Sequence, residues 1–277
     1  MVFRRYDSVD AFASDMLPIL LENEVQNNLI ISLITDSNKR NTSDWLLATV
    51  SSGGGPCLVA LLIQPFDLLL YEVSNDPFCG AAELLSRELR RIGCSPVGVT
   101  AESSLCARFA EAYSHSSESS LKMTMAAMRL DTLSAFNRAP GFCRMLDERD
   151  MTYAPHWERA FSQECKVHVF TVTEITRRLT RRLGKDNHCI WEDGKPVSQA
   201  VHGRDTPNGA VINGVYTPPE YRGCGYATSV VGELSQRLLD RGAGFCCLFA
   251  DASNPASMAL YRNLGYNVVC ELDVRKF

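Results

Sequence analysis

The chain has 277 residues, enough for two domains of ordinary size or one large domain. Hydrophobic residues make up 45% and charged residues 22%, which is typical of a globular protein with a substantial core. A formal net charge of −4 argues against a general nucleic-acid binder and against a protein that adheres to anionic membranes. We therefore expect neither nucleic acid nor a membrane among its partners.

The cysteines indicate a reducing compartment. There are eleven of them, an odd number, and no two are arranged as Cys-x-x-Cys. A disulfide framework is not expected in a chain of this size, so the cysteines predict a cytoplasmic location. Two short pairs, Cys165-x-x-His168 and His188-Cys189, lack a second ligand pair at zinc spacing. We therefore predict no metal site.

Residues 1–113 alternate between strands and helices. Apolar residues recur at helical spacing in residues 10–22 and 78–92, and Gly93 ends the second of these helices. A glycine-rich turn at residues 52–56 joins two β-rich runs as a hairpin. In chain order we predict a strand at 3–7, helices at 10–22 and around 25–33, strands at 45–51, 57–64 and 66–73, a helix at 78–92, a strand at 97–100 and a helix at 103–113.

The second half repeats this order of elements. A polar connector, residues 114–120, and a strand at 122–133 lead into it. Asp193-Gly194 is a strong turn signal between two strands. In chain order we predict a strand at 141–146, an acidic first helical turn at 147–150, helices at 151–164 and 172–183, strands at 188–192, 195–202 and 210–217, a helix at 227–241, a strand at 245–250 and a helix that starts at Asn254-Pro255.

The repeated order of elements suggests an internal duplication. The halves open with loosely similar phrases, Phe3-x-Arg5-x-Asp7-x-x-Asp10 and Phe142-x-Arg144-x-x-Asp147-x-x-Asp150. We therefore predict an α/β fold with a central mixed sheet flanked by helices. Its domains would be residues 1–120 and 141–277, connected by a strand and linker at 121–140. The alternative is an N-terminal helical cap of unrelated origin.

The stretch after the strand at 210–217 is the strongest functional signal. Pro218 and Pro219 end the strand, and a glycine-rich turn, Arg222-Gly223-Cys224-Gly225-Tyr226-Ala227, leads directly into an amphipathic helix. The first N–H groups of a helix have no partners within it, and the helix dipole adds partial positive charge there. Glycine lets an anion approach the backbone closely and permits positive φ angles. This arrangement predicts a phosphate-binding site.

The motif is neither the G-x-G-x-x-G of dinucleotide-binding folds nor the G-x-x-x-x-G-K-[ST] of P-loops. Instead, Arg222-x-x-Gly225-x-Ala227 resembles the acetyl-CoA pyrophosphate loop, [RQ]-x-x-G-x-[GA], of the GNAT N-acetyltransferase family. Further on, Asn254-x-x-Ser257-x-x-x-Tyr261-x-x-x-Gly265-Tyr266 resembles the family's N-x-x-[AS]-x-x-x-Y-x-x-x-G-[FY] segment. The resemblance covers roughly residues 141–277. It implies a tandem GNAT-like acyl-CoA N-acyltransferase fold whose first copy is degenerate.

The resemblance implies an enzyme that transfers the acetyl group of acetyl-CoA to a primary amine by direct attack in a ternary complex. The co-substrate would lie between two splayed parallel strands, 210–217 and 245–250. Tyr261 would be the general acid for the departing thiolate, although its spacing alone indicates a core aromatic residue. Asn254 matches the position that contacts the pantetheine arm, although by itself it indicates a helix cap. The backbone groups implied to hold the pantetheine arm and polarise the thioester are those of Val215, Tyr216 and Thr217, and the N–H groups implied to hold the pyrophosphate are those of Arg222, Gly223, Cys224, Gly225, Tyr226, Ala227 and Thr228.

Several questions stay open at the level of sequence. The general base is unassigned: Glu192, Glu220 and Asp251 are candidates, and a chain of water molecules is a further one. The acceptor is expected to be a small-molecule or peptide amine, and a homodimer is compatible with the sequence. A CoA-binding sensor without turnover and an acyltransferase for longer acyl-CoA remain alternatives. In the first half, the loop at 74–80 has no Arg-x-x-Gly-x-Ala and contains Asp76, which would repel a pyrophosphate, so we predict that this half is a structural partner.

Overall fold

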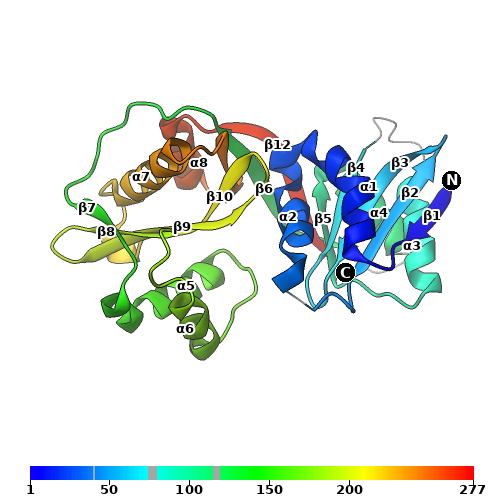
Figure 1. Cartoon of the computed structure of the whole chain (residues 1–277), viewed down its shortest axis with the longest axis horizontal. Helices are drawn as coiled ribbons and strands as arrows, with labels where there is room; N and C mark the ends of the chain where they lie inside the picture. The colour runs from blue at the N-terminus through cyan, green and yellow to red at the C-terminus, as the bar shows by residue number, and fades with distance from the viewer. Residues whose placement is uncertain (40, 74–79, 115–118) are drawn as a thin grey trace. The chain divides into compact units, whose positions relative to one another are not determined.

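The structure is a computed structural model that describes residues 1–39, 41–73, 80–114 and 119–277. The chain forms two compact units. The first unit comprises residues 1–127, 250–253 and 268–277, and the second comprises residues 128–249 and 254–267 (Figure 1). Most of the first-half loop at 74–80 and of the polar connector at 114–120 lies outside the described residues.

The first unit is a mixed sheet with helices on both faces. Its strand order is β1-β2-β3-β4-β5-β12-β6. Strands β4 and β5 pair in parallel, whereas β1–β2, β2–β3, β3–β4 and β5–β12 are antiparallel. The strands are β1 (Val2–Arg5), β2 (Leu46–Ser52), β3 (Gly55–Leu62), β4 (Leu68–Glu72), β5 (Gly98–Glu102), β6 (Ser120–Leu130) and β12 (Asn267–Lys276), and the helices are α1 (Val9–Leu21), α2 (Glu24–Thr35), the 3-10 helix η1 (Ser37–Lys39), α3 (Ala81–Arg91) and α4 (Ser103–Tyr113).

Two hydrophobic cores lie on opposite faces of this sheet. Leu46 and Ala48 of β2 belong to the core that includes residues of α3 and α4. Leu47, between them, belongs to the core that includes residues of α1 and α2. Successive side chains of a strand point to opposite faces, so a strand that is covered on both sides must be apolar throughout. This explains the continuous apolar runs of the sequence in β2 and β3.

The last strand of the chain belongs to the first unit. Residues 268–276 of β12 lie within it, and the strand pairs antiparallel with β5 from Leu272↔Glu102 to Lys276↔Gly98. The hydroxyl of Thr124 on β6 also donates a hydrogen bond to Asp273 Oδ1 at 2.7 Å. The units therefore differ from the predicted ranges 1–120 and 141–277, because a partner more than 160 residues away in sequence holds this strand. Sequence spacing did not predict β12.

The second unit contains the glycine-rich turn. Its strand order is β11-β10-β9-β8-β7, in which β10 and β11 pair in parallel and the other neighbours are antiparallel. The strands are β7 (Phe142–Met145), β8 (His188–Glu192), β9 (Pro196–Asp205), β10 (Gly209–Tyr216) and β11 (Phe245–Asp251), and the helices are α5 (Ala154–Glu164), α6 (Val172–Thr180), α7 (Tyr226–Asp240), α8 (Pro255–Leu264) and the 3-10 helices η2 (Glu148–Thr152) and η3 (Pro219–Tyr221).

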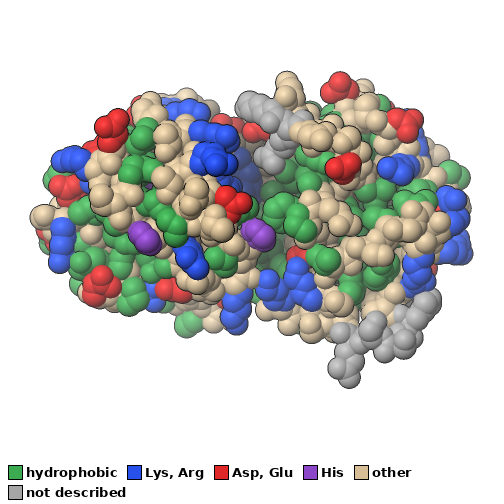
Figure 2. Space-filling model, turned by 90° about the horizontal axis from the view of Figure 1, so that it is seen from below, with side chains coloured by type: hydrophobic (Ala, Val, Ile, Leu, Met, Phe, Trp, Pro, Cys, Tyr) green, Lys and Arg blue, Asp and Glu red, His purple; other side chains and the backbone are tan. Residues whose placement is uncertain are grey.

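Helices cover both faces of this second set of strands. In Figure 1, α7 and α8 lie on one side of β8–β10, and α5 and α6 lie on the other. Val230, Val231 and Leu234 of α7 are buried, as the predicted apolar face required. Acidic and basic side chains both occur across the face drawn in Figure 2, in keeping with the small net charge.

The mixed α/β class and the order of elements predicted from sequence are confirmed. One local difference is that residues 147–150 do not begin the helix at 151–164. Asp147 instead caps the 3-10 helix η2, and α5 starts separately with Pro155 in its first turn. Proline fits the first turn of a helix because its missing N–H is not needed there, so it favours a new helix start at this point.

Candidate cofactor and active site

Strands β10 and β11 part in the middle of the second unit. They pair in parallel at Gly209↔Phe245, Ala210↔Cys246 and Val211↔Cys247, and the pairing ends there. Strand β10 remains paired with β9 on its other edge as far as Tyr216↔Gln199. From Ile212 onward, the backbone edge of β10 that faced β11 is therefore open. The resemblance implied such a pair of splayed parallel strands at these positions.

Buried polar side chains of β8 and β9 fix the end of β10. The Gln199 amide donates to the carbonyl oxygen of Gly214 at 3.3 Å, and the Ser198 hydroxyl donates to that of Tyr216 at 3.3 Å. His188 contacts Gln199 through Nε2 at 3.3 Å, and burial lowers the pKa of this imidazole to about 3, so it is neutral. The backbone implied to hold a pantetheine arm is thus held rigidly.

The turn after β10 presents a row of N–H groups. Gly223 (φ +78°) and Gly225 (φ +80°) are both left-handed, and Gly225 caps helix α7. The first bond of the helix runs from Ser229 N–H to Gly225 O at 3.0 Å. Within the described part of the chain, the N–H groups of residues 223–228 have no hydrogen-bond acceptor. Free N–H groups at a helix N-terminus fit an anionic group such as a diphosphate.

A cavity of about 490 Å³ adjoins the start of α7. Gly225 and Thr228 form part of its lining, as does Asn263 of α8. The remaining lining residues are Ala135, Phe136 and Asn137, which precede β7. This volume is typical of a pocket for a small ligand.

Arg222 contacts the protein itself. Its Nε donates to Thr217 O at 2.9 Å, and its Nη2 lies 2.9 and 2.8 Å from the two carboxylate oxygens of Glu164, the last residue of α5. Its backbone N–H donates to Pro219 O at 3.3 Å. Arg222 therefore fastens the turn to β10 and α5, and its contact with a phosphate stays a prediction. No motif identified Glu164 as its partner.

Tyr261 lies on α8 and is 8% exposed. Its ring meets that of Tyr266 edge-on, with 5.8 Å between the ring centroids. Burial raises the pKa of the Tyr261 phenol above its usual value, with a smaller contribution from Cys165 at the end of α5. No hydrogen bond to the Tyr261 hydroxyl occurs among the residues that the structure describes. The phenol is thus protonated and available to donate.

Asn254 caps helix α8, the role that its position in the sequence indicates without the family resemblance. Its Oδ1 accepts a hydrogen bond from the Ser257 N–H at 3.1 Å, so it caps the N-terminus of α8. The residue is exposed. A contact with the pantetheine arm stays a prediction.

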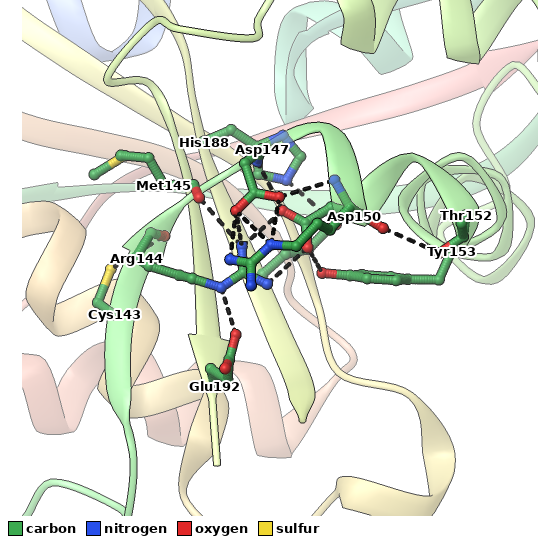
Figure 3. A network of polar contacts seen from close by, with 11 residues as sticks. Cys143, Arg144, Met145, Asp147, Asp150, Thr152, Tyr153, His188 and Glu192 are labelled. Atoms are coloured by element: carbon green, nitrogen blue, oxygen red, sulfur yellow. Dashed lines mark hydrogen bonds and ion pairs between the residues drawn. The ribbon is translucent and has the colours of Figure 1, made fainter. Parts of the chain in front are cut away.

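Two of the three candidate bases are engaged within the protein. Glu192 accepts a short hydrogen bond from Arg144, which also binds both carboxylate oxygens of Asp150 at 2.7 Å (Figure 3). Asp251 accepts bonds from the N–H and the hydroxyl of Ser253, at 2.9 and 2.6 Å. Glu220 is exposed.

The network of Figure 3 stabilises the fold near β7. Asp150 is fully buried and accepts a hydrogen bond from the Tyr153 hydroxyl as well as from Arg144. Burial acts to raise the pKa of Asp150, but the hydrogen bonds from Arg144 and Tyr153 outweigh it and the pKa lies below its usual value. A buried charge must be paired and hydrogen-bonded to persist. The similar phrases that open the two halves therefore have a structural role in the second.

Two absences concern only the residues that the structure describes. They contain no group of three or more His, Cys, Asp or Glu side chains placed to hold a metal ion. They also contain no helix long and apolar enough to cross a membrane.

Comparisons with known proteins point to one family. A family model described as "Acetyltransferase (GNAT) family" matches residues 146–266. No curated protein matches the sequence. A GCN5-related N-acetyltransferase from Sphaerobacter thermophilus superimposes with a TM-score of 0.69 at 18% identity, covering 100% of this chain and 95% of that one.

Two other solved structures resemble the full chain. An acetyltransferase of the GNAT family from Colwellia psychrerythraea has a TM-score of 0.63 at 12% identity, with 100% of both chains covered. A tandem GNAT protein from the clavulanic acid biosynthesis pathway, solved without AcCoA, has a TM-score of 0.60 at 15% identity, with 100% of this chain and 98% of that chain covered. Identities this low establish the fold alone, and the fold is the predicted tandem one. Together with the family match, they identify residues 146–266 as a domain of the acetyltransferase (GNAT) family.

Proposed function

We propose that the second unit transfers the acetyl group of acetyl-CoA to a primary amine of a small molecule or peptide, by direct attack in a ternary complex. The observation that carries the proposal is the row of unbonded N–H groups at residues 223–228, placed directly after the strand that parts from β11. A diphosphate bound there would direct the rest of an extended thioester toward the open edge of β10. The family match supports the same reaction class.

Two steps of the transfer have a candidate group in this chain. Acetyl-CoA supplies the acetyl group as a thioester. The rigid backbone around Val215 would orient the thioester and polarise its carbonyl, a kind of stabilisation worth about 3–4 kcal/mol per donor in other enzymes. Tyr261 would donate its phenolic proton to the departing sulfur, since its raised pKa keeps it protonated at neutral pH.

The amine must lose a proton during the reaction. Glu192 and Asp251 are occupied by internal hydrogen bonds, and this favours water over either carboxylate as the first proton acceptor. Reactivity would then rise with pH as the free amine becomes neutral.

A thiol-release assay tests the proposal. Purified protein is mixed with acetyl-CoA and a panel of polyamines, amino acids and peptides with free N-termini, and free coenzyme A is measured together with the mass of the product. We expect stoichiometric thiol release and a 42-Da gain on at least one amine class. Coenzyme A binding without turnover on any amine would instead favour a sensor, and no binding would reject the proposal.

A further inference from the structure

Helix α6 and the turn after it form a strongly basic segment. Residues 177–185 contain four arginines, one lysine and no acidic residue, although the whole chain has a net charge of −4. Ile175 and Leu179 are buried in a hydrophobic cluster, which fixes the side of α6 that faces the protein interior. The exposed cations of the segment, called the basic face below, are Arg177, Arg178, Arg181 and Lys185.

The carboxylates close to the basic face have other partners. Glu158 of α5 binds Arg182 at 2.7 Å, and Asp186 binds Arg241 at 3.1 Å. Glu174, the acidic residue of α6, is hydrogen-bonded within the capping box of that helix. Among the residues that the structure describes, none forms an ion pair with a side chain of the basic face. Its positive charges are therefore not neutralised within the described part of the protein.

The arrangement of the basic face suits an anion. Arg177 and Arg181 lie about one helical turn apart, and like charges at this spacing repel each other. The dipole of α6 places about half a negative charge at its C-terminus, which is less than the charge of these arginines. Arg178 lies over the ring of Phe170, with 4.4 Å between the guanidinium carbon and the ring centroid, and this contact restrains it. Arginine binds carboxylate or phosphate oxygens through two parallel hydrogen bonds.

One short segment connects the basic face to the proposed active site. Glu164, the last residue of α5, contacts the hydroxyl of Tyr216 at 3.5 Å and the guanidinium of Arg222, both at the end of β10. Residues 165–171 separate α5 from α6. The reach of an extended chain and the rise of a helix place Arg177 within about 35 Å of Glu164. An extended peptide of about eleven residues spans that distance.

We infer that the basic face binds an acidic segment of a protein or peptide acceptor while the amine of that acceptor lies at the thioester. The inference rests on the proposed function and narrows its acceptor to acidic polypeptides. A nucleic acid or an anionic membrane extends beyond the basic face and meets the net negative charge of the chain. A short acidic segment meets the basic face alone, so charge complementarity favours it.

Thiol release from acetyl-CoA with peptide acceptors tests the inference on the full chain. The probes are two peptides of about twelve residues with a free N-terminal amine, one with glutamates and the other with glutamines in its C-terminal half. The variant combines Arg177→Glu and Arg181→Glu. The matched control combines Arg87→Glu and Lys122→Glu, which makes the same change in net charge at exposed cations of the first unit.

The wild type should have a KM at least about 10-fold lower for the glutamate peptide than for the glutamine peptide, because several exposed ion pairs of up to about 5-fold each act together. The preference should shrink at high salt. The variant should lose the preference while its kcat and its affinity for coenzyme A stay unchanged, and the control should keep it. A peptide with lysines in place of the glutamates should be a better substrate for the variant than for the wild type, which also shows that the variant is folded.

Equal KM values of the wild type for the glutamate and glutamine peptides would overturn the inference, as would a preference that survives in the variant. Fluorescence anisotropy with a single-stranded RNA and co-sedimentation with phosphatidylserine vesicles test the other anions. Tighter binding of either one than of the glutamate peptide, lost in the variant, would overturn the choice of an acidic polypeptide.

Failure of the inference is distinguishable from failure of the proposed function. If the glutamine peptide or a small amine is acetylated and the glutamate peptide is not preferred, the inference falls and the proposed function stands. If no amine is acetylated although the glutamate peptide binds, the proposed function falls and the acceptor role of the basic face falls with it.

Discussion

Helices α3 and α7, one in each unit, both start directly after a glycine in the left-handed region. They differ in the residues of their first turns. Gly80 (φ +70°) caps α3 and Gly225 (φ +80°) caps α7. In α3, the first two residues are buried and the third is Glu83, whose carboxylate lies near Gly80. The first turn of α7 contains no acidic residue, and its third residue, Thr228, lines a cavity.

The difference between the two first turns indicates which helix needs an external anion at its N-terminus. A carboxylate in the first turn satisfies the partial positive charge of a helix N-terminus. Helix α3 carries a carboxylate in its first turn, whereas the first turn of α7 contains no acidic residue. This contrast supports the prediction that the first half is structural and the second half binds an anion.

The largest effect is expected from Gly225→Val. A β-branched residue at φ +80° is strongly disfavoured, so the turn must change and its N–H groups turn away. Loss of two hydrogen bonds to a charged ligand corresponds to at least about 100-fold weaker coenzyme A binding, measured by calorimetry. Gly80→Val is the matched control: it should lower the free energy of unfolding and leave the affinity unchanged. Unaltered binding by folded Gly225→Val would contradict the assignment of the turn.

Tyr261→Phe should lower turnover by about 100-fold, the lower end of general acid catalysis, with little change in coenzyme A affinity. The ring and its packing on Tyr266 remain, so only the proton donor is lost. Because burial raises the pKa of Tyr261, turnover of the wild type should not fall through ionisation of this residue below about pH 10.

Tyr113, at the end of α4, is the tyrosine of the first unit with which Tyr261 can be compared. Its ring packs on Phe109 and Phe277, with 5.6 and 4.8 Å between the ring centroids. Tyr113→Phe should leave turnover unchanged. If both tyrosine variants retain full turnover, Tyr261 is a packing residue as well.

Thr228→Glu would give α7 the carboxylate that α3 has at the same position. We expect about 10-fold weaker coenzyme A binding from like-charge repulsion, and a gain of about 0.3–1 kcal/mol in the free energy of unfolding. Thr228→Gln tests for the added bulk alone and should bind more tightly than Thr228→Glu. Equal affinities of the two variants would indicate that no negative charge binds at this helix.

The smallest effect is expected from Glu164→Gln, which frees Arg222. An exposed ion pair is worth up to about 1 kcal/mol, so coenzyme A should bind up to about 5-fold more tightly once Arg222 no longer contacts a carboxylate. Glu158→Gln, on the same helix, breaks the pair with Arg182 and serves as the control. The gain should shrink at high salt. A loss of affinity would show that Glu164 orients Arg222 for the ligand.

Local sequence patterns predicted most of the fold. The helix expected at 103–113 coincides with α4, and the apolar face of α7 is the buried one. Strand β12 was not predicted, although residues 270–275 alternate apolar and polar side chains as a strand does; its pairing with β5 became evident only in the structure. The predicted acidic helical turn is a separate 3-10 helix, since the buried Asp150, paired with Arg144, holds it in place.

The candidate site was predictable only where a motif exists. The glycine-rich turn and Tyr261 each belong to a motif of fixed residue spacing, which can be recognised in the sequence. The partner of Arg222, Glu164, lies on another helix and has no motif, so folding alone brings the two together. The same holds for Asn137 and Asn263, which meet at one cavity although they are far apart in sequence.

A crystal structure of the protein with coenzyme A would test the central claim most directly. We predict diphosphate oxygens within about 3.2 Å of the backbone nitrogens at the start of α7, between residues 223 and 228. Coenzyme A bound elsewhere, or a helix front closed by side chains of the protein, would contradict the account.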